Sequence, residues 1–398
     1  MEDSLDIDSH DTSIGFVSTY APTVCGIASY TASLVNAVAS DRDSRFGLGV
    51  VDLTDRSSDS ITPDVVFHHR TGDRASLRKA ARTLNSFDAV SIQHEFGIFG
   101  GTDGDEVIDL VSKLTVPTVV TFHTVLEYPS ENQRLIVDRL AEQVDRMVVM
   151  SQTASQRLIL RYGVDPKRVE VIPHGADALF AGPSLVTGDR PLALTWGLIG
   201  PGKGLESAIE AFGELVDLDP LPRYLIAGAT HPHVRAAAGE SYRQSLISLV
   251  HNLGLEDLIE FDNQYLDRKS LARLVRSADL VVLPYESVEQ VTSGVLVEAI
   301  AASKPVIATQ FSHAVELLSG GAGITVPHGD PGAMSAALRR LLTDARLTAQ
   351  MAHEAQTLAN GWYWPTIGQR FGSMMGRVAE AGRFGAPRIA REVHRVAG

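Results

Sequence analysis

The sequence DLVVLPYESVEQVTSGVLVEAIAASKPVIAT, residues 279–309, predicts a strand, a loop, a helix and a second strand. Residues 279–285 form a short run rich in Val and Leu, which is typical of a buried parallel strand. The helix is expected from Gly294 to Ser303, and the second buried strand from Pro305 to Thr309. In a parallel sheet of this kind, ligands bind at the carboxyl ends of the strands.

The start of this helix has the features of a phosphate site. Thr292 and Ser293 are good N-cap residues, and Gly294 allows another molecule to approach the first turn closely. The free N–H groups and the roughly half positive charge of a helix N-terminus favour a bound phosphate. Glu298 lies about one turn further on, where it could accept hydrogen bonds from sugar hydroxyls.

A second loop with phosphate-binding features is LIGPGKG, residues 198–204. It lies between a predicted strand and a predicted helix, and glycines around one lysine in that position favour phosphate contact. It is not a P-loop, because Gly204 follows Lys203 where Ser or Thr is required. We expect Lys203 to bind a diphosphate, since a lysine within a glycine loop has little structural reason to be there.

The composition bounds the class of protein. The chain has 398 residues, 44% of them hydrophobic, which is enough for two domains with substantial cores. Its formal charge of −13 argues against broad contact with nucleic acid or anionic lipid. One cysteine, Cys25, excludes an intramolecular disulfide and favours a reducing compartment. With neither a secretory signal nor an apolar membrane span in the sequence, we expect a cytoplasmic protein.

Strands and helices alternate in the first half of the chain. A strand at residues 13–19 runs into the loop YAPTVCGIA and then a helix from about Ser29 to Ser40, as at the start of a Rossmann-like unit. The loop lacks G-x-G-x-x-G, so an ordinary βα turn remains an open alternative. For Cys25 we favour a small residue in a tight loop over a reactive thiol.

Two further strands in this half end in polar residues. The strand at 89–94 ends in His94 and is followed by Glu95 and a glycine-rich loop, and His123 ends the strand at 116–124. These strand ends are expected at the ligand-binding edge of the sheet. We therefore predict substrate contacts for His94, Glu95 and His123. The alternatives are a hydrogen-bonded turn for the first two and a structural histidine for the third.

Together these motifs resemble the retaining, GT-B-fold glycosyltransferases of family 4. Glu298-Ala299 and the strand KPVIA at 304–308 match the family's C-terminal signature. That signature has two Glu residues eight apart, and Gln290 stands in place of the first. Lys203-Gly204 match the end of its G-R-x-x-x-x-K-G loop, with Leu198 in place of the Arg. In the first half, His123 matches a T-x-H motif that Asp usually follows, and Thr124 replaces that Asp.

The resemblance implies an α/β protein with the GT-B fold, two Rossmann-like doubly wound domains facing a central cleft. The expected order is a disordered leader at 1–12, an N-terminal acceptor domain at 13–180, a C-terminal nucleotide-sugar donor domain at 190–361, a C-terminal helix at 362–382 that crosses back to the first domain, and a mobile tail at 383–398.

The resemblance also implies the activity, transfer of a hexosyl group from a nucleoside-diphosphate sugar to a hydroxyl of a glycan or lipid-linked acceptor. Mannose and glucose are both expected sugars, and GDP and UDP both remain open. The residues implied are Lys203, Glu298 and His123 for catalysis; Gly26, Gly202, Gln290, Thr292, Ser293 and Gly294 for donor binding; and His94 and Glu95 for acceptor or sugar contact. In the front-face mechanism often proposed for this family, the departing phosphate takes the acceptor's proton.

No metal or other cofactor is expected. His231 and His233 form a His-x-His pair, but without a third ligand cluster we favour a nucleotide-base contact or a plain turn. The D-x-D triplets at 103–105 and 217–219 do not end hydrophobic strands, as those of a metal-dependent transferase would. We expect no nucleic-acid partner, and any membrane association is expected to be peripheral.

Three alternatives remain at this point. A nicotinamide dehydrogenase should have G-x-G-x-x-G followed by an acidic residue, which the first turn lacks. A non-catalytic nucleotide-sugar-binding protein would keep the pocket and lose the chemistry. A GT-B epimerase or phosphorylase-like enzyme would need no acceptor other than water or phosphate.

Overall fold

The computed structural model describes residues 12–41, 46–55, 62–185 and 188–384. Contacts divide the chain into two compact units, Met1–Pro173 with Pro365–Gly398, and His174–Trp364. The expected leader and tail lie almost wholly outside the described residues. Within those residues, no helix has both the length and the apolar character that crossing a membrane requires.

The first unit is built on a parallel sheet with strand order β3-β2-β1-β4-β5-β6-β7. Its strands are β1 Thr12–Ser18, β2 Phe46–Thr54, β3 Val65–Arg70, β4 Ala89–His94, β5 Thr118–Phe122, β6 Arg146–Val149 and β7 Val169–Val171. The order reverses between β1 and β4, which is where ligands bind in a doubly wound sheet. The loops that carry Gly26 and Glu95 begin at this point.

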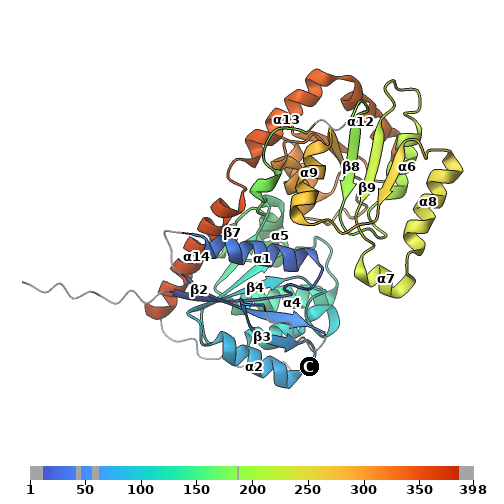
Figure 1. Ribbon diagram of the computed structural model, residues 1–398. Helices are drawn as coiled ribbons and strands as arrows, with labels where there is room; N and C mark the ends of the chain where they lie inside the picture. The colour runs from blue at the N-terminus through green and yellow to red at the C-terminus, as the bar shows by residue number, and fades with distance from the viewer. Residues whose placement is uncertain (1–11, 42–45, 56–61, 186–187, 385–398) are drawn as a thin grey trace, which may run out of the picture. The chain divides into compact units, whose positions relative to one another are not determined.

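Helices pack on this sheet in the manner of a Rossmann-like unit (Figure 1). They are α1 Gly26–Ala39, α2 Arg74–Leu84, α3 Glu106–Val111, α4 Glu131–Gln143, α5 Gln152–Tyr162 and α14 Trp364–Phe384, with short 3-10 turns η1 Thr102–Gly104 and η2 Pro166–Arg168. Helix α14 joins this unit from the far end of the sequence. A Cβ on Gly368 would lie 2.6 Å from the Cβ of Ala37, so the glycine allows α14 to pack closely against α1.

The second unit has a parallel sheet with strand order β10-β9-β8-β11-β12-β13. Its strands are β8 Leu192–Trp196, β9 Arg223–Ala227, β10 Ile259–Asp262, β11 Leu280–Leu283, β12 Val306–Thr309 and β13 Gly323–Val326. The order reverses between β8 and β11. The loops that carry Lys203 and Gly294 follow these two strands, so both predicted phosphate motifs begin at the reversal.

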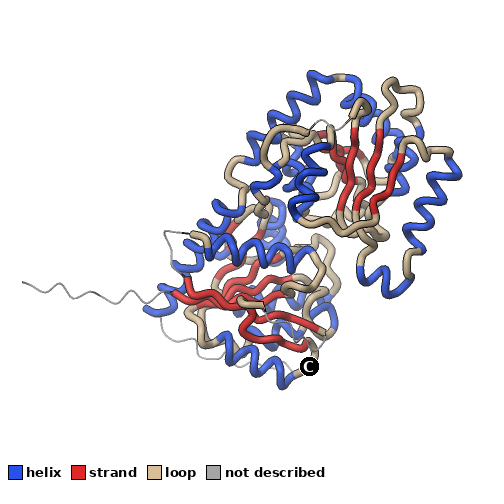
Figure 2. The backbone as a smooth tube through the Cα atoms, in the orientation of Figure 1, coloured by secondary structure: helices blue, strands red, loops and turns tan. Residues whose placement is uncertain are grey.

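Helices cover both faces of this second sheet (Figure 2). They are α6 Leu205–Gly213, α7 Pro232–Ala238, α8 Ser241–Leu253, α9 Arg268–Ser277, α10 Gly294–Ala301, α11 Ser312–Leu318, α12 Pro331–Thr343 and α13 Ala345–Ala359, with a 3-10 turn η3 Ala178–Phe180. One core lies between the sheet and the layer of α9, α10 and α13. The other lies beneath α6, α8 and α12.

The predicted unit at residues 279–309 is confirmed as β11, α10 and β12, with Val281 paired in parallel to Val306. Some boundaries differ. Helix α1 begins at Gly26 rather than near Ser29, because the Cys25 sulfur accepts from the backbone N of Ala28 and caps the helix. Strand β5 ends at Phe122, so His123 lies just beyond the strand.

The segment expected to end the first domain, residues 174–180, shares its contacts with the second unit. Phe180 is fully buried in the core beneath α9 and α10. The rings of His174 and Trp364 lie 5.7 Å apart, and the backbone N of Ala176 donates to the carbonyl of Trp362. The chain therefore enters the second unit at His174 and leaves it at Trp364, two residues that contact each other.

Candidate functional site

The N-terminus of α10 is tightly built. The Ser293 hydroxyl accepts from the backbone N of Leu296 at 3.2 Å, and the backbone N of Ser293 donates to Nδ1 of His313 at 2.9 Å. A Cβ on Gly294 would lie 3.0 Å from Nε2 of His174. The close approach that Gly294 permits is therefore occupied, in this structure, by the His174 imidazole.

Two other residues of this loop were predicted to bind the donor. The side-chain amide of Gln290 donates to the carbonyl of Thr292 at 3.0 Å, so it shapes the loop. The hydroxyl oxygen of Thr292 is buried and has no hydrogen-bond partner among the described residues. An unsatisfied buried hydroxyl beside a helix N-terminus favours a ligand that would complete its hydrogen bonding.

The Lys203 loop lies against the segment that follows β11. Gly204 has φ of +63°, and a Cβ there would lie within bonding distance of the Pro284 carbonyl oxygen, so only glycine fits. The backbone N of Glu286 donates to the carbonyl of Gly202 at 3.0 Å. These contacts place the Lys203 loop against residues 284–286 of the segment 279–309, at the reversal between β8 and β11.

Lys203 itself is a cation without a counter-ion among the described residues. Its Nζ lies 4.3 Å from the centre of the Tyr285 ring, a cation–π contact. Burial lowers the pKa of Lys203 below its ordinary value, and no carboxylate opposes that effect. The loop therefore holds a positive charge that an anionic ligand would stabilise.

Glu298 is held by two residues that the sequence did not single out. Trp196, the last residue of β8, donates from Nε1 to Oε2 of Glu298 at 3.3 Å. Arg268, the first residue of α9, donates from Nη1 to Oε1 at 2.6 Å. The sequence offered one indication of these contacts, the position of Trp196 at the carboxyl end of a predicted strand.

In the first unit, His123 and Glu95 lie at the carboxyl edge of the sheet. Nε2 of His123 is 3.0 Å from Oε1 of Gln93, and its ring meets the Tyr30 ring edge-on at 4.7 Å. Glu95 accepts from the Thr124 hydroxyl at 2.5 Å. Burial raises the pKa of Glu95 in spite of this hydrogen bond. Thr124, in place of the Asp usual in the family, thus fixes a carboxylate from the neighbouring strand end.

His94 needs a correction, because its side chain does not lie open to a ligand. It is fully buried, and its ring packs against those of Phe96, Phe99 and Phe122. Neither ring nitrogen has a hydrogen-bond partner among the described residues. Burial lowers the pKa of His94 to about 3, so the ring is neutral near pH 7. His94 packs the core, and we do not carry it into the site.

The loop of Gly26 is less constrained than expected. A Cβ on Gly26 would meet no atom within 4 Å, so neither packing nor backbone conformation requires glycine there. The sulfur of Cys25 lies 3.3 Å from the hydroxyl of Thr19 and caps α1. This agrees with the structural interpretation of Cys25.

The His231–His233 pair lies at the start of α7, where His231 is the N-cap and His233 belongs to the first turn of the helix. Nδ1 of His231 accepts from the backbone N of His233 at 3.3 Å, and the two rings stack at 5.4 Å. Burial lowers the pKa of His231, helped by the charges of His233 and Lys203. Across the part of the chain that the structure describes, no three His, Cys, Asp or Glu residues gather as a metal site.

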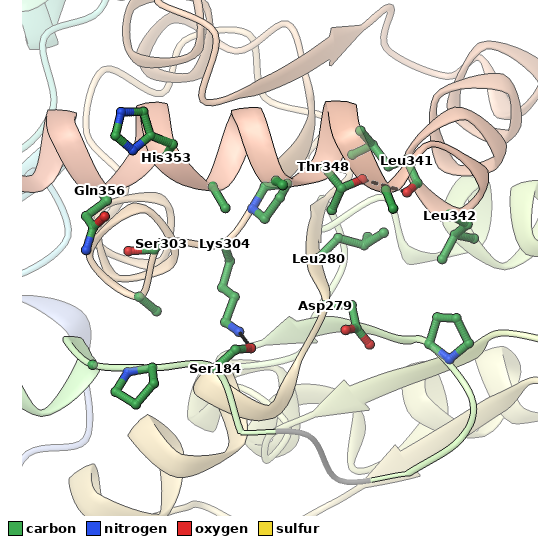
Figure 3. Close-up of a pocket in the computed structure, with 18 residues that line it drawn as sticks. Ser184, Asp279, Leu280, Ser303, Lys304, Leu341, Leu342, Thr348, His353 and Gln356 are labelled. Carbon is green, nitrogen blue, oxygen red and sulfur yellow. Dashed lines mark hydrogen bonds between the residues drawn. The ribbon is translucent and has the colours of Figure 1, made fainter.

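A cavity of about 910 Å³ lies at the other edge of the second sheet (Figure 3). Asp279, Pro305 and Lys304 line it at the amino ends of β11 and β12, and α13 covers it. Nζ of Lys304 donates to the Ser184 hydroxyl at 2.5 Å and to the Arg276 carbonyl at 2.8 Å. Lys304 therefore ties the segment before β8 to α9, away from the Lys203 loop.

Comparisons with known proteins agree with this architecture. Residues 35–178 match the model described as Glycosyltransferase Family 4, and residues 181–358 match Glycosyl transferases group 1. The D-inositol 3-phosphate glycosyltransferase of Kineococcus radiotolerans is 29% identical over 63% of this chain and 63% of its own. That of Rhodococcus opacus is 28% identical over 63% of this chain and 59% of its own. The chain thus spans less than two thirds of these relatives.

Two solved structures share the fold. Anabaena Alr3699/HepE in complex with UDP has a TM-score of 0.69 at 18% identity and covers 92% of this chain and 100% of its own. Sucrose-phosphate synthase from Thermosynechococcus elongatus has a TM-score of 0.72 at 18% identity and covers 93% of this chain and 100% of its own. These neighbours and the two parallel sheets establish the architecture, and the family matches cover most of the chain. The chain therefore belongs to the family 4 glycosyltransferases and has the GT-B fold.

Proposed function

We propose that this protein transfers a hexosyl group from a nucleoside-diphosphate sugar to a hydroxyl of a glycan or lipid-linked acceptor, with retention of configuration. The observation that carries the proposal is the cation of Lys203, which has no counter-ion among the described residues and is held in a glycine loop against the segment that leads to α10. The names of the curated relatives support a glycosyl transfer. The neighbouring structure with UDP supports a nucleoside-diphosphate donor.

Departure of the nucleoside diphosphate is the step that Lys203 would assist. As the bond between the anomeric carbon and the phosphate oxygen breaks, negative charge develops on the diphosphate. Lys203 and the N–H group of Gly294 would stabilise that charge, together with the dipole of α10. We propose that these groups supply the positive charge without a metal ion.

The acceptor would attack from the face that the diphosphate leaves. A bond forms between the acceptor oxygen and the anomeric carbon, and the acceptor's proton passes to the departing phosphate oxygen. No protein nucleophile takes part in this front-face route. Glu298 would accept from the ribose hydroxyls, and Thr292 and the loop shaped by Gln290 would orient the sugar.

His123 and Glu95 are assigned to the transferred sugar or the acceptor. The contacts with Gln93 and Tyr30 fix the His123 ring. Glu95 is oriented by the Thr124 hydroxyl and can accept from a further hydroxyl. Both are therefore suited to hydrogen bonding with sugar hydroxyls.

One surface observation favours a lipid-linked acceptor. Helix α2 carries four exposed basic side chains, although the chain as a whole has a formal charge of −13. They are Arg74, Arg78, Lys79 and Arg82. Each basic residue near an anionic lipid surface contributes about 1 kcal/mol of attraction. We propose peripheral association with such a surface through the outer face of α2.

The proposal is tested by transfer from UDP-glucose and GDP-mannose to a panel of hydroxyl acceptors, including inositol 3-phosphate, the compound in the relatives' names. Product that keeps the donor's anomeric configuration, formed in the presence of EDTA, supports the account. Donor turnover with water or phosphate alone would indicate an epimerase or phosphorylase. Donor binding without turnover on any acceptor would indicate a non-catalytic binding protein, and hydride transfer to NAD would indicate a dehydrogenase.

A further inference from the structure

The contact between Arg268 and Glu298 joins two helices of the second unit at the carboxyl edge of its sheet. Arg268 begins α9, and its Nη1 donates to Oε1 of Glu298 at 2.6 Å. Trp196 ends β8, and its Nε1 donates to Oε2 at 3.3 Å. One carboxylate on α10 is thus held from two sides, by one donor on each oxygen.

The guanidinium of Arg268 is itself held in place. It lies 5.0 Å from the centre of the Phe180 ring, and its Nε is 3.9 Å from Oδ2 of Asp177. The arginine side chain is 44% exposed, whereas that of Glu298 is 13% exposed. The pair therefore lies at the surface of the unit with the carboxylate set slightly inward.

The start of α9 does not depend on this arginine side chain. The carboxylate of Asp267 caps the helix by accepting from the backbone N of Lys269 at 2.9 Å and of Ser270 at 3.0 Å. An interior face of α9, with Ala272 and Val275, packs into the core. Capping and packing thus explain the helix, and the Arg268 contact needs another explanation.

The chemistry of a carboxylate supplies one. Each of its oxygens has two acceptor sites, and Arg268 and Trp196 use one on each oxygen. Each carboxylate oxygen of Glu298 therefore keeps one free acceptor site, and the orientation of these two sites is fixed. Two such acceptors match the two O–H donors of a vicinal diol.

We propose that Arg268, assisted by Trp196, is a positioning residue that fixes Glu298 for the 2′,3′-diol of a ribonucleotide. This inference rests on the proposed function and deepens it, because it makes the site select ribose over 2′-deoxyribose. Arg268 acts through Glu298 and does not touch the diphosphate. Its removal should therefore change the discrimination between the two sugars and leave the affinity for pyrophosphate unaltered.

The experiment is calorimetric titration of the wild type and variants with UDP, 2′-deoxy-UDP and pyrophosphate, and with the corresponding guanine and adenine nucleotides. A site that hydrogen-bonds a hydroxyl rejects the analogue that lacks it, and we expect UDP, or the nucleotide preferred, to bind about tenfold tighter than its deoxy form. In Arg268→Ala that ratio should fall below about threefold, with pyrophosphate affinity unchanged. Arg268→Lys should recover only part of the ratio, because a lysine lacks the planar guanidinium.

Two control variants separate positioning from general disturbance. Arg273→Ala removes an exposed arginine from the same helix and should keep the wild-type ratio. Trp196→Phe removes the other donor to Glu298 and should lower the ratio in the same direction as Arg268→Ala. Each variant is compared with the wild type by circular dichroism before titration.

The outcomes that overturn the inference differ from those that overturn the proposed function. An unchanged ratio in Arg268→Ala, or parallel weakening of UDP and pyrophosphate, would contradict a positioning role. If the wild type bound UDP and 2′-deoxy-UDP equally, the inference would also be contradicted, but the diphosphate site would still be supported. If the wild type bound none of the nucleoside diphosphates, the proposed function and this inference would both fail.

Discussion

Replacing Lys203 by methionine tests the diphosphate site through two quantities, the affinity for a diphosphate and the stability of the ligand-free protein. The change removes the charge and keeps a flexible side chain of similar length above the Tyr285 ring. Affinity for a diphosphate should fall, while the empty protein should lose no stability. If Lys203 had only a structural role, its replacement would lower the stability of the ligand-free protein and leave the diphosphate affinity unchanged.

The loss of affinity follows from the hydrogen bonds that Lys203 would make. A hydrogen bond to a charged group contributes about 1.5–3 kcal/mol, which corresponds to a factor of about 10–150 in the dissociation constant. The variant should therefore bind UDP, or whichever nucleoside diphosphate the wild type prefers, at least tenfold more weakly. Pyrophosphate should weaken by a similar factor, because Lys203 is assigned to the phosphates.

The stability of the empty protein follows from the desolvated charge. Because the pKa of Lys203 is lower in the folded state, the unfolded chain binds more protons in the pH range between the two pKa values. The free energy of unfolding of the wild type therefore rises with pH across that range, up to about pH 10.4. Lys203→Met should remove this rise and be no less stable at pH 7.

The assay is urea unfolding between pH 7 and pH 10, with and without pyrophosphate, together with calorimetric titration. Lys167→Met, which removes an exposed lysine from the first unit, is the matched control and should behave as the wild type. Unaltered diphosphate affinity in Lys203→Met would refute the assignment. A marked loss of stability in the empty variant would show that Lys203 is a structural residue.

Three further predictions follow from particular contacts. Gly294→Ala places a Cβ 3.0 Å from the His174 ring. By displacing that ring, the change should weaken UDP binding at least fivefold in calorimetric titration. Unchanged affinity for UDP would contradict this prediction. Burial lowers the pKa of His94, His174 and His313 to about 3, 4 and 3. Below pH 6.5 the unfolded chain therefore binds more protons than the folded protein. The free energy of unfolding should fall on acidification, by at most about 4 kcal/mol per pH unit. In urea unfolding, His94→Leu should reduce that slope by about a third; an unchanged slope would refute the assignment. Replacing the four basic residues of α2 by glutamine should abolish sedimentation with anionic vesicles at low salt; retained sedimentation would exclude that face.

The sequence predicted the part of the site that local signals determine. The segment at 279–309 combines a buried strand, N-cap residues and a glycine, and each of these acts within a few residues of chain. The Lys203 loop carries a signal of the same kind. Because both loops follow strands of one parallel sheet, topology alone placed them at a common edge.

Contacts between distant residues could not be predicted in the same way. Trp196 and Arg268 lie 102 and 30 residues from Glu298, and their contacts depend on how α9 and α10 pack. For His94 the strand end was predicted and the environment was not. Its burial depends on the positions of Phe96, Phe99 and Phe122, three rings that gather only in the folded chain.

The most direct test of the central claim is thermal unfolding with UDP, GDP, ADP and NAD, each added separately at millimolar concentration. A ligand that binds only the folded state raises the free energy of unfolding by roughly 2.7 kcal/mol at a hundred times its dissociation constant. The account predicts a clear rise in Tm with a nucleoside diphosphate and a smaller rise in Lys203→Met. A rise with NAD alone, or with none of the four, would contradict the diphosphate site at Lys203 and Gly294.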